Sequence, residues 1–215
     1  MTVNEIFENF LLDNPELAPL RAEVAKAYGV LRETYEAHGK TLICGNGGSA
    51  SDSEHIVGEL MKSFKLPRRL NEQQRAAFDV FSNGSYMADN LQLSLPAISL
   101  VSQTSLLTAY LNDVAPDMLF AQQVYGYGLP GDTLIALSTS GNSGNTVNAA
   151  KAAKVKGVKV IALTGASESL LSEIADVCVR LPSSETYKIQ EYTLPVYHAL
   201  CAMLEEEFFG ENKQS

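Results

Sequence analysis

The chain has 215 residues, of which 46% are hydrophobic, and its formal net charge is −9. This length favours a single domain with a sizeable core, and the acidic balance argues against a broad basic surface for nucleic acid or anionic lipid. The acidic balance does not exclude binding of a small anionic ligand, because backbone N–H groups and hydroxyls hold phosphate without basic side chains.

The sequence also bears on the cellular compartment. No apolar run is long enough for a membrane span, and the acidic N-terminus lacks the basic start of a signal peptide. The three cysteines show no paired spacing, which fits reduced thiols. We therefore expect a cytoplasmic protein without membrane contact and without direct nucleic-acid binding.

The first 39 residues predict an N-terminal helical segment. Over 16–38 apolar residues recur at three- and four-residue steps, which is the spacing of an amphipathic helix. Gly39 follows this helix as an expected C-cap.

An α/β core is expected over 40–209, where short apolar runs alternate with helix-like segments. The strands are predicted at 41–44, 96–101, 132–138, 158–163 and 176–181. The helices are predicted at 50–63, 105–111, 117–127, 143–156, 167–175 and 186–209. Residues 66–94 are interpreted as an insertion, with a short helix at 72–78 and a turn over Ser82–Ser85.

This alternation predicts a doubly wound α/β fold, with a five-stranded parallel sheet covered by helices on both faces. Ligands of such sheets bind beyond the carboxyl ends of the strands. Two turns rich in glycine and hydroxyls follow predicted strands, so we expect both at one edge of the sheet.

The turn after the third predicted strand reads STSGNS. Ser138, Thr139 and Ser140 present hydroxyls, Gly141 permits a close backbone approach, and Ser143 is an expected N-cap of the next helix. These features suit a phosphate cradle at a helix N-terminus. An ordinary N-capped turn explains the same residues, and the pattern alone leaves the two interpretations equally open.

The turn after the first predicted strand reads GNGGS. Gly47, Gly48 and Ser49 could surround a sugar or phosphate. In the following helix His55 and Glu59 are four residues apart and share a face. Alone, this pair is weak evidence for a metal or for acid–base chemistry, and an exposed helix pair explains it as well.

The last predicted helix carries Gln190 and His198, eight residues apart and on neighbouring faces. Pro195 lies between them and predicts a kink. A histidine on a long helix is by itself more simply a packing residue.

Together these motifs resemble the SIS (sugar isomerase) domain family, and most closely its phosphoheptose isomerase branch. The resemblance runs from GNGGS and the His–Glu helix through STSGNS to IQE and the final histidine, about 40–207. It implies one flavodoxin-like SIS domain over 1–215 and an aldose–ketose isomerase of sugar phosphates, with sedoheptulose 7-phosphate as the expected substrate. It also implies a homotetramer with active sites at subunit interfaces.

The resemblance assigns roles to particular residues. Glu59 and His198 are the implied catalytic pair, and an enediol mechanism needs one group to move the proton and another to polarise the carbonyl. Zinc, one per subunit, is an implied cofactor held by His55, Glu59, Gln190 and His198. The implied substrate and phosphate contacts are Asn46, Gly47, Gly48, Ser49, Asp113, Ser138, Thr139, Ser140, Ser143 and Gln190.

The chain departs from the family pattern in two regions. Ser63 stands where the family often has a basic residue, and Arg68 or Arg69 could replace that residue or belong to a solvated loop. Tyr187 and Lys188 stand where family members often have Asp-Arg. The stretch between Glu59 and the second predicted strand, which contains the 66–94 insertion, is longer than in the family. A lid, an interface element and a neutral excursion are all open for the insertion.

A second function stays open at this level. A non-catalytic SIS protein could sense a sugar phosphate, or act as an adaptor of the type that binds the bacterial replication initiator, because fold does not fix function. Such a protein has little need of the full set of four residues at the reacting end of the sugar, which are His55, Glu59, Gln190 and His198.

Overall fold

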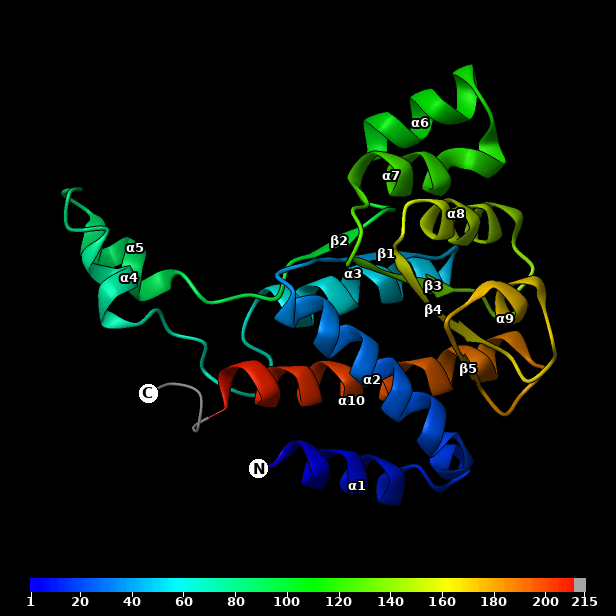
Figure 1. Ribbon diagram of the computed structural model, residues 1–215, viewed down its shortest axis with the longest axis horizontal. Coiled ribbons are helices and arrows are strands. Elements are labelled where there is room, and N and C mark those ends of the chain that lie inside the picture. Colours follow the sequence, from blue (N-terminus) through cyan, green and yellow to red (C-terminus); the bar gives the residue numbers. More distant parts are fainter. Residues whose placement is uncertain (211–215) are drawn as a thin grey trace.

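The computed structural model describes residues 1–210 and consists of a parallel sheet between two helical layers (Figure 1). The strands are β1 (Thr41–Cys44), β2 (Ala97–Ser99), β3 (Thr133–Leu137), β4 (Lys159–Thr164) and β5 (Val177–Arg180). All pairings are parallel and the spatial order is β2-β1-β3-β4-β5. The predicted doubly wound sheet is confirmed, and its switch point lies between β1 and β3.

The helices and 3-10 turns connect these strands in chain order. They are α1 (Val3–Asp13), η1 (Pro15–Leu20), α2 (Arg21–Glu36), α3 (Gly48–Met61), α4 (Glu72–Ala76), α5 (Gly84–Asn90), α6 (Thr104–Asp113), η2 (Pro116–Met118), α7 (Leu119–Tyr127), α8 (Gly144–Val155), α9 (Leu170–Ile174) and α10 (Thr186–Phe209). In the described range 1–210, no helix is long and apolar enough to cross a membrane.

Each face of the sheet has its own hydrophobic core, because strand side chains alternate between the faces. Ile43 and Ile135 belong to the cluster formed with α1, α2, α3 and α10. Leu42 and Leu134 belong to the cluster formed with α7, α8 and α9. The layer with α3 and α10 matters here, because those helices carry the predicted reactive residues.

The N-terminal segment differs from the prediction in detail. The expected helix 16–38 is divided into η1 and α2, and α2 ends at Glu36 with Ala37 as C-cap. The left-handed residue after it is His38, with φ of 58°, and not Gly39. Gly39 instead donates its N–H to the Thr34 carbonyl at 2.8 Å, so it closes the helix without the positive φ that its type suggested.

The insertion contains more helix than predicted. The helix expected at 72–78 is α4, but α5 occupies the place where Ser82–Ser85 predicted only a turn. These two helices form an arm that stands away from the sheet at the left of Figure 1. The arm exposes Val80, Phe81 and Tyr86, at 78%, 57% and 70% of their surface.

Candidate active site

The STSGNS turn lies between β3 and α8, at the carboxyl edge of the sheet. Ser138 is buried and its Oγ lies 3.0 Å from Ser143 Oγ. Ser143 occupies the N-cap position of α8, as predicted, but its hydroxyl makes no hydrogen bond to the helix. The expected side-chain cap is therefore wrong, and the hydroxyl is paired within the turn. Ser143 therefore caps none of the first-turn N–H groups of α8, although the Thr146 N–H donates to Asn145 Oδ1 at 2.9 Å. The uncapped N–H groups of a helix N-terminus are the ones that can bind an anion.

Gly141 shapes this turn by a close approach. Its φ is +66°, and a Cβ there would lie 2.1 Å from Ser169 Oγ. Any other residue would be strained and would collide with the start of α9. The glycine expected from the sequence is thus required by packing inside the protein.

The two glycine-rich turns meet at the edge of the sheet, as predicted. Asn46 of the GNGGS turn and Asn145 of α8 exchange two side-chain hydrogen bonds of 2.9 and 2.8 Å. This reciprocal amide pair fixes the first turn against the second across β1 and β3.

A small cavity of about 230 Å³ adjoins the STSGNS turn. Hydroxyl side chains of Thr139, Ser140, Ser167, Ser183 and Ser184 line it. Hydroxyls and helix N–H groups in one place can hold an anionic group without basic side chains.

Helices α3 and α10 run side by side in the same direction. A Cβ at Gly48, at the start of α3, would lie 2.6 Å from Gln190 Nε2 on α10. Seven residues later on each helix, the Nδ1 atom of His55 lies 2.9 Å from the Tyr197 hydroxyl. The predicted reactive residues of the two helices therefore face one another along a common seam.

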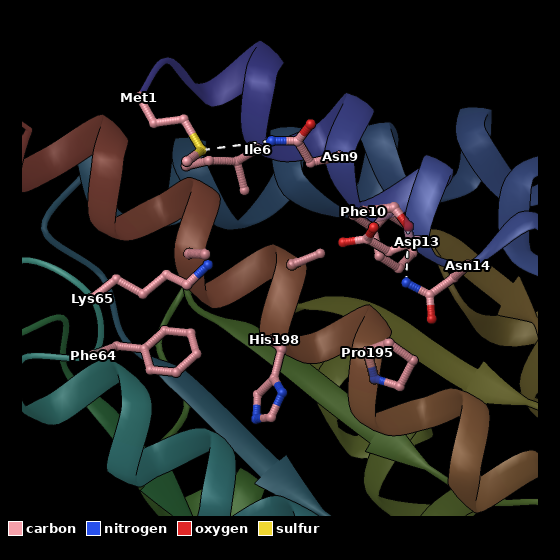
Figure 2. A pocket seen from close by; sticks show the side chains of 12 residues that line it. Met1, Ile6, Asn9, Phe10, Asp13, Asn14, Phe64, Lys65, Pro195 and His198 are labelled. Atoms are coloured by element: carbon pink, nitrogen blue, oxygen red, sulfur yellow. Dashed lines mark hydrogen bonds between the residues drawn. The ribbon is translucent and has the colours of Figure 1, made fainter.

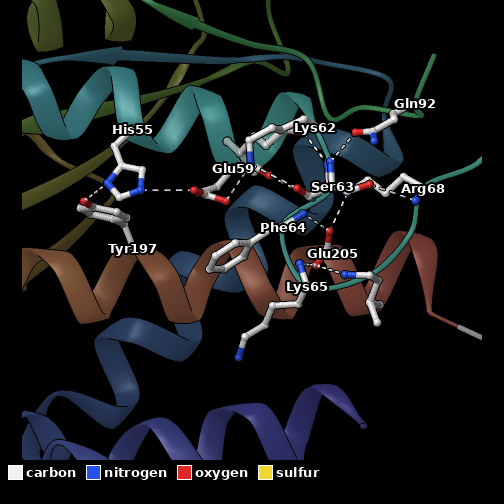
Figure 3. A network of polar contacts seen from close by, with 12 residues as sticks. His55, Glu59, Lys62, Ser63, Phe64, Lys65, Arg68, Gln92, Tyr197 and Glu205 are labelled. Carbon is white, nitrogen blue, oxygen red and sulfur yellow. Dashed lines mark hydrogen bonds and ion pairs between the residues drawn. The ribbon is translucent and has the colours of Figure 1, made fainter. Parts of the chain in front are cut away.

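His55 contacts both Glu59 and His198 at the middle of this seam. His55 Nε2 lies 3.2 Å from Glu59 Oε1, and the His55 and His198 rings are 5.0 Å apart between centroids. Figure 3 shows Glu59 on α3 with His55 and Phe64 close by. The Phe64 ring lies 5.5 Å from the His198 ring and covers it on the side of the loop after α3.

Two reactive atoms at this place lack hydrogen-bond partners. Glu59 Oε2 and His198 Nε2 are buried and accept or donate no hydrogen bond. Lys62 Nζ lies 3.7 Å from Glu59 Oε2, which is an ion pair without a hydrogen bond. Because buried polar atoms are normally satisfied, the two atoms are available to a ligand.

Burial lowers the pKa of His198, and the neighbouring His55 lowers it further, whereas the Glu59 charge acts in the opposite direction. The neutral imidazole is therefore the favoured form near neutral pH. The helix face of His198 also adjoins a cavity of about 360 Å³ between α1, α10 and the loop at Phe64 (Figure 2).

The predicted zinc ligands have suitable donor types, but the structure does not group them as a formed metal site. Among residues 1–210, no three His, Cys, Asp or Glu side chains are gathered as a metal site. The donor types still fit zinc, since two imidazoles, a carboxylate and an amide lie along one seam and two of their atoms are unpaired. The His55 side chain is 44% accessible, and its Nε2 atom faces Glu59 at 3.2 Å.

Asp113 is not brought to this seam. It lies exposed at the end of α6, and its side chain accepts a hydrogen bond from Asn112 at 2.8 Å. In Figure 1, α6 stands beyond α7, on the opposite side of the sheet from α10. Within this single chain, the predicted substrate contact of Asp113 is therefore not formed.

Arg68 corrects another expectation. It neither belongs to a solvated loop nor reaches a substrate, because its side chain is 0% exposed. Its Nε donates to Glu205 Oε1 at 2.8 Å, and its other nitrogens donate to the Leu60 and Glu59 carbonyls. Glu205 also accepts the backbone N–H groups of Phe64, Lys65 and Leu66. This network holds the end of α3 against α10.

Comparison with known proteins agrees with this geometry. A model of the SIS domain matches residues 74–165. The phosphoheptose isomerase of Rhodospirillum rubrum is 40% identical over 183 residues, which cover 85% of each chain. The chain belongs to the phosphoheptose isomerase family.

Solved structures of this family extend the likeness to the whole fold. The phosphoheptose isomerase of Neisseria gonorrhoeae superposes with a TM-score of 0.73 at 31% identity, over 95% of this chain and 97% of the other. That of Francisella tularensis gives 0.75 at 29%, over 95% and 96%. The SIS match at 74–165 includes the STSGNS turn but not His55, Glu59 or His198, so membership at the reactive seam rests on these full-length relatives.

Proposed function

We propose that this phosphosugar isomerase interconverts sedoheptulose 7-phosphate and glycero-manno-heptose 7-phosphate through an enediol. The observation that carries the proposal is the pair of unsatisfied buried atoms, Glu59 Oε2 and His198 Nε2, beside the shared neighbour His55. The substrate follows from the relatives, which are named phosphoheptose isomerases.

The chemistry assigns one proton role to each residue of the pair. Converting the ketose to the aldose moves a proton from C1 to C2 and one between the oxygens. Glu59 takes the carbon-bound proton at Oε2, the oxygen that makes no hydrogen bond in the free protein. His198 is neutral near pH 7 and keeps one ring hydrogen, with which it can hydrogen-bond and polarise the carbonyl oxygen. As the hydroxyl proton of O1 is taken up, the same imidazole can deliver a proton to O2, so that its own proton count is restored.

The phosphate is proposed to bind at the hydroxyl-rich turns. Ser138, Thr139, Ser140 and Ser143 supply hydroxyls, and α8 contributes N–H groups at its positive end. On the other turn Asn46, Gly47, Gly48 and Ser49 border the same edge, and Gln190 closes the space against Gly48. Asp113 would need a neighbouring subunit to reach a substrate, which accords with the proposed homotetramer and its interfacial sites.

Zinc, one per subunit, is proposed as a cofactor held by His55, Glu59, Gln190 and His198. When bound, it would polarise the carbonyl and diol oxygens of the substrate as a Lewis acid. The chain's own contribution is to keep imidazole and carboxylate atoms unpaired in a half-buried seam. A cytoplasmic location is proposed as well, from the sequence features given above.

The adaptor function is not favoured. The relatives that match over most of the chain are named phosphoheptose isomerases, and all four reactive-end residues are present. Comparing turnover of sedoheptulose 7-phosphate with that of fructose 6-phosphate tests the proposal. A kcat/KM clearly higher for the heptulose supports it, and binding of either sugar without turnover would overturn it.

Ser143→Ala is expected to raise KM for the phosphorylated substrate by about 10-fold or more, because a hydrogen bond to a charged group is lost. Stability should change by less than about 1 kcal/mol, since this hydroxyl does not cap α8. Steady-state kinetics and urea unfolding measure the two effects. Ser169→Ala is a matched control, because that hydroxyl caps α9 and should cost stability. Equal KM for wild type and Ser143→Ala would contradict the phosphate assignment.

Protein purified without chelator is expected to carry about one zinc per chain by elemental analysis, and His198→Ala should lose most of it. His38→Ala is the control, because His38 follows α2 and lies outside the seam. Zinc that persists in His198→Ala would contradict the proposed ligand set.

A further inference from the structure

Tyr197 links two parts of the reactive seam through its hydroxyl. Its side chain is 2% exposed, and its oxygen lies 2.9 Å from His55 Nδ1 and 3.3 Å from Asp52 Oδ1. The other His55 nitrogen, Nε2, lies 3.2 Å from Glu59 Oε1. The four groups thus form one line, Asp52–Tyr197–His55–Glu59, whose last three members are visible in Figure 3.

This line has three polar contacts but only two hydrogens to place in them when Tyr197 and His55 carry one each. Its three polar contacts each need a hydrogen between the heavy atoms, or a cation in place of one. A neutral tyrosine and a neutral histidine supply two hydrogens, and two carboxylates supply none. When His55 carries a single ring hydrogen, one contact therefore has no hydrogen and can take a cation, either between Asp52 and Tyr197 or between His55 and Glu59.

The hydroxyl has a defined direction in this line. The Tyr197 phenol carries a single hydrogen, and its oxygen donates to Asp52 Oδ1 at 3.3 Å. The Asp52 carboxylate can only accept, and donation to it leaves the Tyr197 oxygen to accept from His55 Nδ1. The Nδ1 contact, at 2.9 Å, is also shorter than the Nε2 contact, at 3.2 Å.

We propose that Tyr197, oriented by Asp52, is a positioning residue that holds His55 in the tautomer with its hydrogen on Nδ1. The Nε2 lone pair then faces Glu59, and the vacant contact between them is the place for a cation. This inference rests on the proposed zinc role and deepens it. A metal-binding histidine generally donates its other ring nitrogen to an acceptor that fixes its tautomer and orientation.

Tyr197→Phe separates the hydroxyl from the ring. The ring packs edge-on against both His55 and His198, with centroids 5.5 and 4.9 Å away, and phenylalanine retains this packing. Without the hydroxyl, Glu59 is the one polar partner that residues 1–210 still offer to the His55 ring nitrogens, and it attracts a hydrogen to Nε2. Asp52→Ala should act in the same direction, because the hydroxyl is then free to donate to Nδ1.

The test is ¹⁵N NMR of histidine-labelled, metal-free protein at a pH where its imidazoles are neutral, with the His55 signals assigned by their loss in His55→Asn. Wild type should show hydrogen mainly on Nδ1, whereas Tyr197→Phe and Asp52→Ala should shift it to Nε2. Zinc affinity, measured by competition with a chromophoric chelator, should fall about 10- to 100-fold in Tyr197→Phe.

Tyr35→Phe is the matched control, because it removes another buried tyrosine hydroxyl, bonded to Thr41 Oγ1 at 2.7 Å and remote from the seam. It should change neither the tautomer nor zinc affinity. A wild-type protein with hydrogen mainly on Nε2, or a Tyr197→Phe protein with unchanged tautomer, overturns the inference. An Nδ1 tautomer in a protein that binds no zinc would leave the inference standing and overturn the proposed cofactor.

Discussion

Glu59→Gln is expected to lower kcat by about 10²- to 10⁴-fold with little change in KM, the range that general acid–base groups contribute. The amide keeps the size and burial of the side chain but cannot take a proton from carbon. Because Oε2 makes no hydrogen bond in the free protein, its replacement by an NH₂ group breaks none and removes only the 3.7 Å ion pair with Lys62. Steady-state kinetics with sedoheptulose 7-phosphate measures the effect.

The control for this variant is Glu54→Gln on the same helix. Glu54 is exposed, and its Oε1 accepts a hydrogen bond from Ser102 at the surface. Its replacement should leave kcat within about a factor of two of wild type, since surface changes away from the site have small effects. Equal activity of the Glu59→Gln and Glu54→Gln proteins would contradict the role of Glu59.

Arg68→Met is expected to destabilise the protein by about 3–5 kcal/mol, the usual cost of removing one partner of a buried ion pair. The substitution leaves the Glu205 charge buried at 1% exposure without its guanidinium, and it removes two donors to the carbonyls of Leu60 and Glu59. Denaturant unfolding followed by circular dichroism measures the loss. The network holds the last turn of α3, which carries Glu59. Activity of the variant should therefore fall at denaturant concentrations below those that unfold it.

Arg21→Met is the matched comparison, since Arg21 forms an exposed ion pair with Glu8. Exposed pairs contribute between zero and about 1 kcal/mol, so this variant should unfold almost as wild type does. Similar losses for the two arginine variants would show that the Arg68–Glu205 pair does not hold α3 against α10.

The sheet and the last helix could be predicted from the sequence because their signals are local. Parallel strands such as Thr133–Leu137 are buried throughout and apolar after the first residue. The helix Thr186–Phe209 matches the predicted helix at both ends and continues through Pro195. The arm was only half predicted. Asn83 and Gly84, typical turn residues, instead stand at the start of α5.

The candidate site was predicted as residue types but not as a network. His55 and Glu59 share a helix face by simple spacing, which the structure confirms at 3.2 Å. Tyr197 and Asp52, however, are separated by 145 positions, and Arg68 and Glu205 by 137. No periodicity encodes such pairs. Glu205 is the first of three consecutive glutamates after an apolar run of the last helix, and nothing in the sequence separates it from the two that follow.

The central claim is that the isomerisation proceeds by proton transfer at Glu59, and conversion of sedoheptulose 7-phosphate in D₂O tests it most directly. NMR should show the aldose heptose 7-phosphate with deuterium at C2, because a proton held by the carboxylate exchanges with solvent before it returns to carbon. Glu59→Gln should form this product at least about a hundredfold more slowly. Aldose whose C2 hydrogen comes entirely from C1, formed equally fast by Glu59→Gln, would contradict the account.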